Sequence, residues 1–324
     1  MSTLSEIQQL IAPELRQLND LIAQTLSSPN KLMNSIVSEY LKTKGKQIRP
    51  ILVILSARLL GSVNDSVISA AAAVELLHNA SLIHDDVVDE TKTRRGNPTI
   101  NGVWDNHIAV LVGDFFVSSS LMRALDTNDP RVLNSVAQLG RHLSLGELDQ
   151  LYSARFHTLD ESVYFNTIQH KTASLFMSCV ELGGFTVGAA EEQIADVREF
   201  ARLLGLCFQI KDDIFDYYED ERIGKPTGND LREGKITLPL LHVLSDNSLP
   251  QHKAMLELSR KENLDSDEIT TLIEYAKSNG GIDYAYSTMA RLRDQAVEIL
   301  AKFGDRPETH LLRNLIDYTI SRPN

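Results

Sequence analysis

The sequence predicts an all-α protein built as one large helical bundle. Apolar residues recur at spacings of three and four, as at Leu133, Val136 and Leu139, and this spacing is typical of a helix with one buried face. No proline occurs between Pro130 and Pro226, although proline is the residue that helix interiors exclude. Strict alternation of apolar and polar residues is hard to find, so we expect no substantial sheet.

Short clusters of Gly, Pro, Asp and Asn mark the expected ends of the helices. Asp65 and Asp160 each precede a helical pattern, so we expect them to be N-caps. Asn101 and Gly102 are expected to form a loop turn, because no alternating strands flank them. No Gly/Ser-rich or Pro-rich linker divides the chain, and we therefore expect residues 1–324 to form a single domain. The expected breaks lie near residues 45–50, 61–65, 91–99, 126–130, 158–161, 188–192, 223–235 and 246–251.

The bulk composition is that of a soluble globular protein, with 43% hydrophobic and 23% charged residues in a chain of 324. A net charge of −12 argues against nucleic-acid binding, which needs a basic surface. The only cysteines, Cys179 and Cys207, lie beside apolar residues, which favours buried packing in a reducing compartment. We see no signal-peptide pattern at the N-terminus and no apolar run of the ~18 residues that a membrane span needs. These observations predict a cytoplasmic enzyme.

Two Asp-Asp-x-x-Asp clusters stand inside apolar stretches, 127 positions apart (212 − 85). They are Asp85, Asp86 and Asp89, and Asp212, Asp213 and Asp216. On a helix, positions i, i+1 and i+4 fall within an arc of roughly 100°, so each cluster points one way. Crowded carboxylates repel one another and are costly among apolar residues unless a cation neutralises them. Mg²⁺ prefers oxygen ligands and bridges carboxylates to phosphates, so the clusters predict a magnesium-dependent diphosphate site. The alternative, a solvated acidic helix face, explains one cluster better than two.

Basic residues near the clusters fit a diphosphate ligand. Each alone is compatible with an ordinary surface charge. Arginine suits phosphate because its planar fork donates hydrogen bonds in pairs. The candidates are Arg94 and Arg95 after the first cluster, Lys225 and Lys235 after the second, and Lys46 and Arg49 between Gly45 and Pro50.

Further polar residues share the faces of the two clusters. His78 lies seven residues before the first cluster, and Gln209 lies three before the second. Lys171 and Thr172 interrupt the apolar stretch 168–177, where a lysine needs a partner. A lone histidine is more often a satisfied core residue than a ligand of phosphate, and both interpretations of His78 stay open.

From Gly45 to about Pro239, the sequence closely resembles the trans (head-to-tail) isoprenyl diphosphate synthase family. The resemblance is carried by Gly-Lys-x-x-Arg-Pro, His-x-Ala-Ser-Leu-Ile-His-Asp-Asp, Arg-Arg-Gly, Lys-Thr-Ala-x-Leu and Phe-Gln-Ile-x-Asp-Asp, in that order. A small departure is Lys44 before Gly45, where the family often has a second glycine. The resemblance implies the all-α isoprenoid synthase fold with a deep central cavity, and a homodimer. The apolar content of segments such as Ile108–Val117, greater than one cavity wall requires, fits a dimer.

The resemblance also implies roles for individual residues. Asp85 and Asp89 resemble ligands of two Mg²⁺ ions, with Asp86 supporting them. Asp212 resembles the main ligand of another Mg²⁺, with Asp213 and Asp216 acting mainly through water, which makes about three ions with diphosphate bound. The residues that resemble the isopentenyl diphosphate site are Lys46, Arg49, His78 and Arg95. The residues that resemble the allylic diphosphate site are Arg94, Lys171, Thr172, Gln209, Lys225 and Lys235.

The reaction implied is the condensation of an allylic prenyl diphosphate with isopentenyl diphosphate. Mg²⁺ and basic residues such as Arg94 would stabilise the departing diphosphate as its charge develops. Lys171, Thr172 and Gln209 would steady the allylic cation, and isopentenyl diphosphate would attack it. We see no Gly-x-Ser-x-Gly motif, and the reaction needs no protein nucleophile.

Product length depends on the positions four and five before Asp85, where bulky aromatics in this family stop chain growth. Here Ser81 and Ala80 are both small, and the first cluster lacks the two-residue insertion of bacterial short-chain synthases. Both features resemble octaprenyl-type enzymes and predict a long product, which would bring the enzyme near membranes. Two alternatives stay open. The product is short, of farnesyl or geranylgeranyl length, or the small residues serve only the close approach of two helices.

Three other functions compete with this interpretation. A terpene cyclase usually carries a mixed Asn/Ser/Glu motif in place of the second aspartate cluster, which is intact here. A metal phosphohydrolase is suggested by His84 beside Asp85, but lacks further paired histidines. A non-catalytic partner subunit is expected to lose cluster aspartates, and none is lost.

Overall fold

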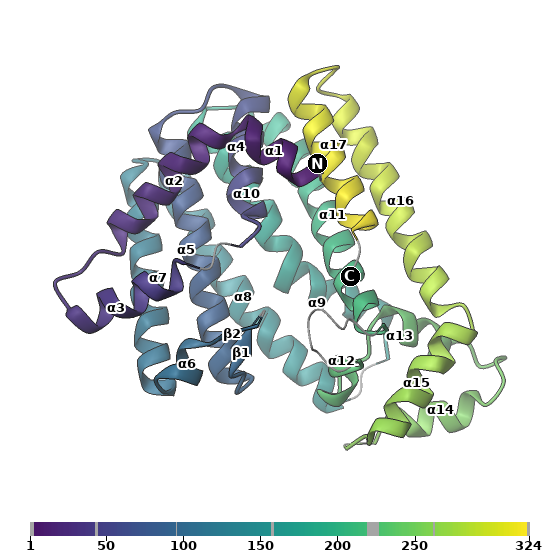
Figure 1. Cartoon of the computed structure of the whole chain (residues 1–324). Coiled ribbons are helices and arrows are strands. Elements are labelled where there is room, and N and C mark those ends of the chain that lie inside the picture. Colours follow the sequence, from purple (N-terminus) through teal and green to yellow (C-terminus); the bar gives the residue numbers. More distant parts are fainter. Residues whose placement is uncertain are drawn as a thin grey trace. The chain divides into compact units, whose positions relative to one another are not determined.

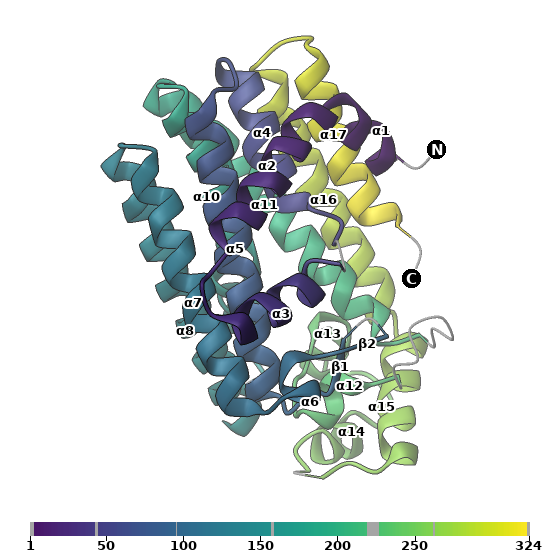
Figure 2. The same ribbon diagram turned by 60° about the vertical axis from the view of Figure 1, so that its left-hand side comes forward.

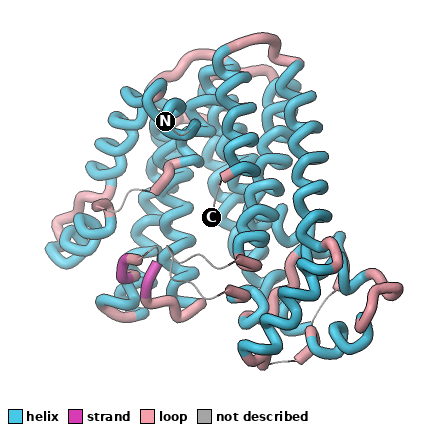
Figure 3. Tube along the Cα trace, turned by 45° about the vertical axis from the view of Figure 1, so that its right-hand side comes forward, coloured by secondary structure: helices cyan, strands magenta, loops and turns pink. Residues whose placement is uncertain are grey.

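The computed structural model describes residues 3–42, 45–94, 96–156, 159–218, 227–261 and 263–322, and for 153–156 the backbone alone. Helices dominate this part of the chain, as predicted (Figures 1 and 3). They are α1 (Thr3–Leu10), α2 (Ala12–Thr25), α3 (Lys31–Tyr40), α4 (Ile48–Leu60), α5 (Asp65–Val88), α6 (Ile100–Val103), α7 (Asn106–Asp126), α8 (Pro130–Phe156), α9 (Glu161–Ile168), the π-helical turn η1 (Gln169–Ala173), α10 (Ser174–Thr186), α11 (Glu191–Phe215), α12 (Asn229–Arg232), α13 (Leu238–Ser245), α14 (His252–Leu258), α15 (Ser266–Ser278), α16 (Gly281–Ala301) and α17 (Pro307–Ser321).

One short hairpin departs from the helical pattern. Strands β1 (Thr93–Arg94) and β2 (Asn97–Pro98) pair antiparallel, with Thr93 opposite Pro98 and Arg94 opposite Asn97. Two-residue strands are too short for alternation to show in the sequence. The expected loop turn at Asn101 and Gly102 is wrong, because both residues lie in α6.

The predicted N-caps are correct at one position and wrong by one residue at the other. The side chain of Asp160 accepts a hydrogen bond from the backbone N–H of Ser162, at 2.7 Å, and caps α9. At α5 the cap is Asn64, whose Oδ1 accepts from the N–H of Val67 at 3.1 Å. Asp65 therefore lies inside the first turn, where a carboxylate still favours the positive end of the helix dipole.

The chain forms two compact units, and several long helices contribute residues to both. The first unit comprises Met1–Arg141, Leu175–Glu199 and Ile299–Leu315, and the second comprises His142–Ser174, Phe200–Glu298 and Ile316–Asn324. The prediction of a single domain over residues 1–324 stays a prediction.

The first aspartate cluster lies at the C-terminal end of α5, a helix that is packed in the core of the first unit. Helix α5 packs along α7, as Figures 1 and 2 show, and α4 packs against α5. The run Ala70–Ala73 is fully buried in α5, and its small side chains allow close helix packing. The hydroxyl of Ser120 on α7 donates to the carbonyl of Ala73 at 2.7 Å. Because α5 is anchored along its length, its C-terminal end has a fixed position.

The second unit places the second cluster at the C-terminal end of α11. Gly205 on α11 approaches η1 so closely that an added Cβ would lie 2.6 Å from the Cα of Ala173. This contact brings the side chains of η1 beside those of α11. Beyond α11, Tyr217, Leu240 and Leu272 belong to a buried cluster formed with α13 and α15. The hydroxyl of Tyr217 lies 3.2 Å from that of Thr237, which joins the end of α11 to the start of α13.

Within the described residues, two helices are long and apolar enough to cross a membrane by length and composition alone. They are α5, of which most is buried within the protein, and α7, of which much less is buried. The burial of α5 is that of a core helix. The absence of a membrane span stays a prediction.

Both cysteines are free and buried, as predicted. Cys179 lies in the first unit and Cys207 in the second. Burial raises the pKa of both thiols, so neither is a reactive thiolate at neutral pH.

Candidate active site

The first aspartate cluster ends α5, and its three carboxylates have different environments. Asp86 is buried, and the Nε and Nη2 of Arg94 both contact its Oδ1, each at 2.8 Å. Burial raises the pKa of Asp86, and the Arg94 guanidinium opposes that rise. The backbone carbonyl of Asp86 also accepts from Asn101 at 2.9 Å. Asp85 is half-buried and Asp89 exposed, so these two carboxylates are better placed than Asp86 to meet a ligand from solution.

His84, the residue before this cluster, rests against a glycine of the neighbouring helix. An added Cβ at Gly113 on α7 would lie 2.2 Å from the Nε2 of His84. The same nitrogen lies 3.4 Å from the carbonyl of Val110 and 3.5 Å from a carboxylate oxygen of Asp114. The ring of His84, just before Asp85, therefore packs against α7 in the space that Gly113 leaves.

Lys46, Arg49 and His78, predicted for the isopentenyl diphosphate site, lie in the first unit, at the start of α4 and on α5. Lys46 is exposed just before α4, and Arg49 lies in its first turn, with its guanidinium carbon 6.0 Å from the centre of the Phe176 ring. His78 is half-buried on α5, two turns before the first cluster. Arg95 lies outside the described residues.

The two predicted chain-length residues are also on α5. Ala80 is completely buried, and Ser81 is half-buried with its hydroxyl donating to the carbonyl of His78 at 2.9 Å. Both side chains are small. The small volume at Ala80 therefore contributes to the close packing of α5.

The second cluster contains a buried hydrogen-bonded network that the sequence had pointed to in part. Thr172 of η1 donates to the Oε1 of Gln209 at 2.6 Å, and Gln209 donates from Nε2 to Asp213 at 2.8 Å. The hydroxyl of Tyr164 on α9 donates to the other oxygen of Asp213 at 2.5 Å. Burial, reinforced by the two neighbouring cluster carboxylates, raises the pKa of Asp213 to about 6 despite these donors. The structure thus brings Thr172, Gln209 and Asp213 together.

Asp216 receives its hydrogen bonds from the backbone, next to a carboxylate that the sequence reasoning missed. The N–H groups of Asn229 and Asp230 donate to its two oxygens at 2.9 and 3.0 Å. Asp230 therefore lies beside the cluster, and burial together with the charges of Asp213 and Asp216 raises its pKa to about 8. Its place between Gly228 and Lys235 was the signal available in the sequence.

Lys171 finds the partners that the sequence demanded. Its ammonium lies 2.5 Å from a carboxylate oxygen of Glu147 and 2.7 Å from the Oε1 of Gln150, both on α8. A close approach makes this possible, because an added Cβ at Gly146 would lie 2.9 Å from the backbone nitrogen of Lys171. The π-helical turn η1 supplies both Lys171 and Thr172, and such turns are frequent at functional sites.

The remaining predicted residues of the second unit have acidic or cationic partners, or lie beyond the description. Lys235 pairs with Glu233. Asp212 pairs with Arg322, a residue that the sequence reasoning did not consider. Lys225 lies outside the described residues.

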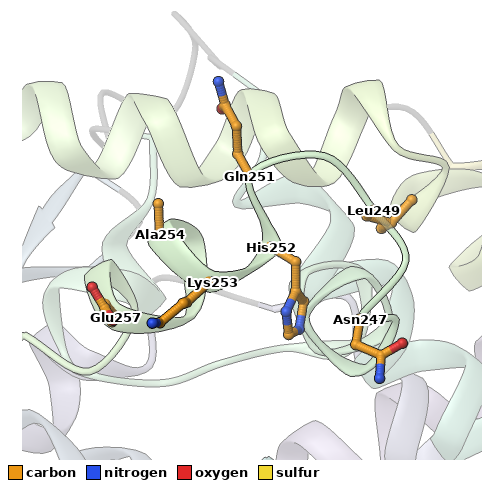
Figure 4. Close-up of a pocket in the computed structure, with 7 residues that line it drawn as sticks. All are labelled: Asn247, Leu249, Gln251, His252, Lys253, Ala254 and Glu257. Carbon is orange, nitrogen blue, oxygen red and sulfur yellow. The ribbon is translucent and has the colours of Figure 1, made fainter.

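Neither cluster forms a complete metal cage on its own. Within the described ranges, no group of three or more His, Cys, Asp or Glu side chains is arranged to hold a metal ion. A pocket lined by His252, Lys253 and Glu257 lies at α14 and contains none of the predicted residues (Figure 4). The ring of His252 is hydrogen-bonded there to the carbonyl of Leu244 at 2.9 Å.

Comparison with known proteins gives consistent matches over nearly the whole chain. The family described as polyprenyl synthetase matches residues 30–276. The octaprenyl diphosphate synthase of Escherichia coli K12 is 31% identical over 320 residues, which cover 98% of this chain and 99% of that protein.

Two solved structures are similar in fold as well as in sequence. A polyprenyl synthase from Caulobacter crescentus, complexed with calcium and isoprenyl diphosphate, has a TM-score of 0.90 and 32% identity, covering 98% of each chain. A geranylgeranyl pyrophosphate synthase from Bacteroides thetaiotaomicron has a TM-score of 0.84 and 38% identity, covering 99% of each chain.

Proposed function

Since this chain belongs to the polyprenyl synthetase family, we propose that it is a prenyltransferase that joins an allylic prenyl diphosphate head-to-tail to isopentenyl diphosphate. The observation that carries the proposal is the network in which Thr172, Gln209 and Tyr164 orient the buried carboxylate of Asp213. A carboxylate that is buried at this cost, among like charges, fits a site where a cation and a diphosphate meet.

The carboxylates of both clusters fit magnesium, and the ions are part of the proposal. All six side chains offer oxygen ligands, which Mg²⁺ prefers. Burial, and after it the charges of Asp212 and Asp216, raises the pKa of Asp213, and a bound cation would offset both effects. We assign Asp85, Asp89 and Asp212 as direct ligands and Asp86, Asp213 and Asp216 as supporting groups. When bound, Mg²⁺ would supply the positive charge that stabilises the departing diphosphate.

The residues of the chain itself do the positioning. Gln209 is fixed by Thr172 on one side and Asp213 on the other, so its amide dipole has a set orientation toward a developing cation. Lys171, held by Glu147 and Gln150, places an ammonium on η1 for the allylic diphosphate. Arg94, Lys225 and Lys235 complete the proposed allylic site. Lys46, Arg49, His78 and Arg95 form the proposed isopentenyl site.

The proposal is tested with purified protein, Mg²⁺ and both substrates. We expect release of diphosphate and a longer prenyl diphosphate. Allylic diphosphate alone converted to a cyclic hydrocarbon would instead support a terpene cyclase. Asp212→Asn should lower turnover by roughly a hundredfold or more without loss of fold, since it removes charge stabilisation at the leaving group.

We further propose that the product is long. The relative from E. coli is named an octaprenyl synthase, and Ala80 and Ser81 are small. The match to a geranylgeranyl synthase at 38% identity keeps a short product as the alternative. Chromatography of products made from a farnesyl primer with excess isopentenyl diphosphate decides between them, because arrest at the C20 product would favour the alternative. Ala80→Phe should then shorten a long product.

A homodimer and a cytoplasmic location are also part of the proposal. Helix α7 supports the dimer, because it exposes several large apolar side chains to solvent, and such a patch often marks a protein–protein interface. They are Val110, Leu111, Leu121, Met122 and Leu125, which we call the α7 apolar face. A second copy of the chain is the proposed cover for this face.

A further inference from the structure

Arg322 is a buried cation at the second aspartate cluster, outside every motif in the sequence. It follows the last residue of α17, and its side chain is only 8% exposed. Its Nη2 lies 2.5 Å from Asp212 Oδ1 and donates also to the carbonyl of Phe208 at 3.2 Å. Asp212 is the carboxylate that the proposed function assigns to a metal ion.

Helix α11 forms a slot for this guanidinium. Phe208, Asp212 and Phe215 are spaced i, i+4 and i+7, so they share one helix face. The guanidinium carbon lies 4.2 Å from the centre of the Phe208 ring and 5.2 Å from that of Phe215. The faces of the two aromatic rings and the Asp212 carboxylate all attract a cation. The slot therefore binds the Arg322 guanidinium through cation–π contacts and an ion pair.

The hydrogen bonding of Arg322 in this slot is incomplete. Its Nε is buried and has no hydrogen-bond partner in the part of the chain that the structure describes. The guanidinium also meets Asp212 through one nitrogen, although an arginine can offer a carboxylate two parallel bonds. The contact between Arg322 and Asp212 is therefore mainly electrostatic. The Nε of Arg322 stays available as a donor to another anion.

We propose that Arg322 is a built-in counter-ion that makes metal binding at Asp212 conditional on diphosphate. The inference rests on the proposed assignment of Asp212 to a metal ion. A guanidinium and a divalent cation on the same carboxylate repel each other, so Arg322 weakens binding of the ion alone. Diphosphate carries enough negative charge to attract both, and the unused donor of Arg322 then has an acceptor. Arg322 is thus a positioning residue that couples the ion to the substrate.

The test measures Mn²⁺ binding without turnover. Mn²⁺ is titrated by electron paramagnetic resonance, alone and with inorganic diphosphate, in an Asp85→Asn/Asp89→Asn background that leaves only the second cluster. Arg322→Gln should bind Mn²⁺ alone about tenfold more tightly, because one repulsive charge is gone. The gain in affinity on adding diphosphate should shrink. Arg322→Lys, which keeps the charge, and Arg313→Gln, which removes an exposed charge from α17, should both match the background.

The outcomes separate this inference from the proposed function. If Asp212→Asn weakens Mn²⁺ binding while Arg322→Gln leaves it unchanged, Arg322 is not a counter-ion and the metal assignment stands. If Asp212→Asn also changes nothing, the metal assignment is wrong and this inference falls with it. Should Arg322→Gln fail to fold, Phe208→Leu removes one wall of the slot and should shift Mn²⁺ affinity in the same direction. No shift in that variant would overturn the inference.

Discussion

Asp213 combines two hydrogen-bond donors with two like-charged neighbours in a buried position. Burial, and then the charges of Asp212 and Asp216, raises its pKa, whereas Tyr164 and Gln209 lower it. Because Gln209 is itself held by Thr172, we expect a change at Thr172 to be transmitted to Asp213 and the proposed metal site.

Thr172→Val tests this transmission while keeping the side-chain shape. The variant loses the 2.6 Å bond to Gln209, so the Gln209 amide gains rotational freedom and no longer presents a fixed dipole. We expect kcat to fall about tenfold with a smaller change in the KM of either substrate. Thr167→Val, one turn earlier, removes only a bond to the carbonyl of Val163 and serves as the control. Equal kinetics for the two variants would show that the Thr172 hydroxyl is dispensable.

The raised pKa values predict how stability depends on pH without metal. Asp213 and Asp230 have a pKa of about 6 and about 8 in the folded protein, above the ordinary value of 3.8. Protonation therefore favours the folded state, and this contribution is full below pH 3.8 and is lost as the pH rises through about 6 and then about 8.

Thermal melts in EDTA should therefore show Tm falling on the order of 5 °C between about pH 6 and pH 9. Added Mg²⁺ should reduce the fall, because a cation offsets the carboxylate charges. Asp230→Asn should remove the upper part of the dependence. A Tm that rises over this range in EDTA would mean that the two carboxyls ionise with less difficulty than their burial implies.

The π-helical turn η1 is the element on which the proposed allylic residues depend. Within this turn, Lys171 faces Glu147 and Gln150, whereas its neighbour Thr172 faces Gln209. A π-turn contains one residue more than an α-helical turn, so it changes the direction of the side chains within it.

Deletion of His170 should therefore damage the protein far more than His170→Ala. The deletion can be absorbed by converting η1 to regular α-helix, which keeps the flanking helices in register but removes the wide turn that carries Lys171 and Thr172. We expect the deletion to abolish turnover while circular dichroism still reports a helical protein. His170→Ala should keep most of the activity. Similar activities for the two would show that the extra residue is not needed.

The elements were more predictable from the sequence than the contacts between them. Breaks near residues 61–65, 126–130 and 188–192 were correct because Gly, Pro and Asp stop helices locally. The hairpin at Arg94 and the π-turn η1 were not predicted, since neither has a distinct apolar periodicity in the sequence. At the site, Lys171, Thr172 and Gln209 were identified together, whereas Asp230 and Arg322 were missed. Arg322 meets Asp212 across 110 positions, a contact that only tertiary packing creates.

At the scale of the whole molecule, the α7 apolar face predicts how many copies assemble. Leu111 is 60% exposed and Met122 is 57% exposed, and two charges placed there should oppose any apolar association. Light scattering of Leu111→Glu/Met122→Glu should report a monomer where the parent protein is a dimer. Leu10→Glu, at an exposed apolar residue of α1, is the control and should stay dimeric. A parent protein that is monomeric at working concentration would contradict the proposal.

Gly113 has a consequence that appears in genetics rather than in biochemistry. It provides the space in which His84 rests, and a methyl group there would meet the ring at 2.2 Å. A Gly113→Ala allele should therefore lose function through the displaced end of α5, although Gly113 lies 28 positions after Asp85 (113 − 85) in the chain. Revertants of that allele should recur at codon 84, with small residues such as alanine in place of histidine, because the two positions share one volume.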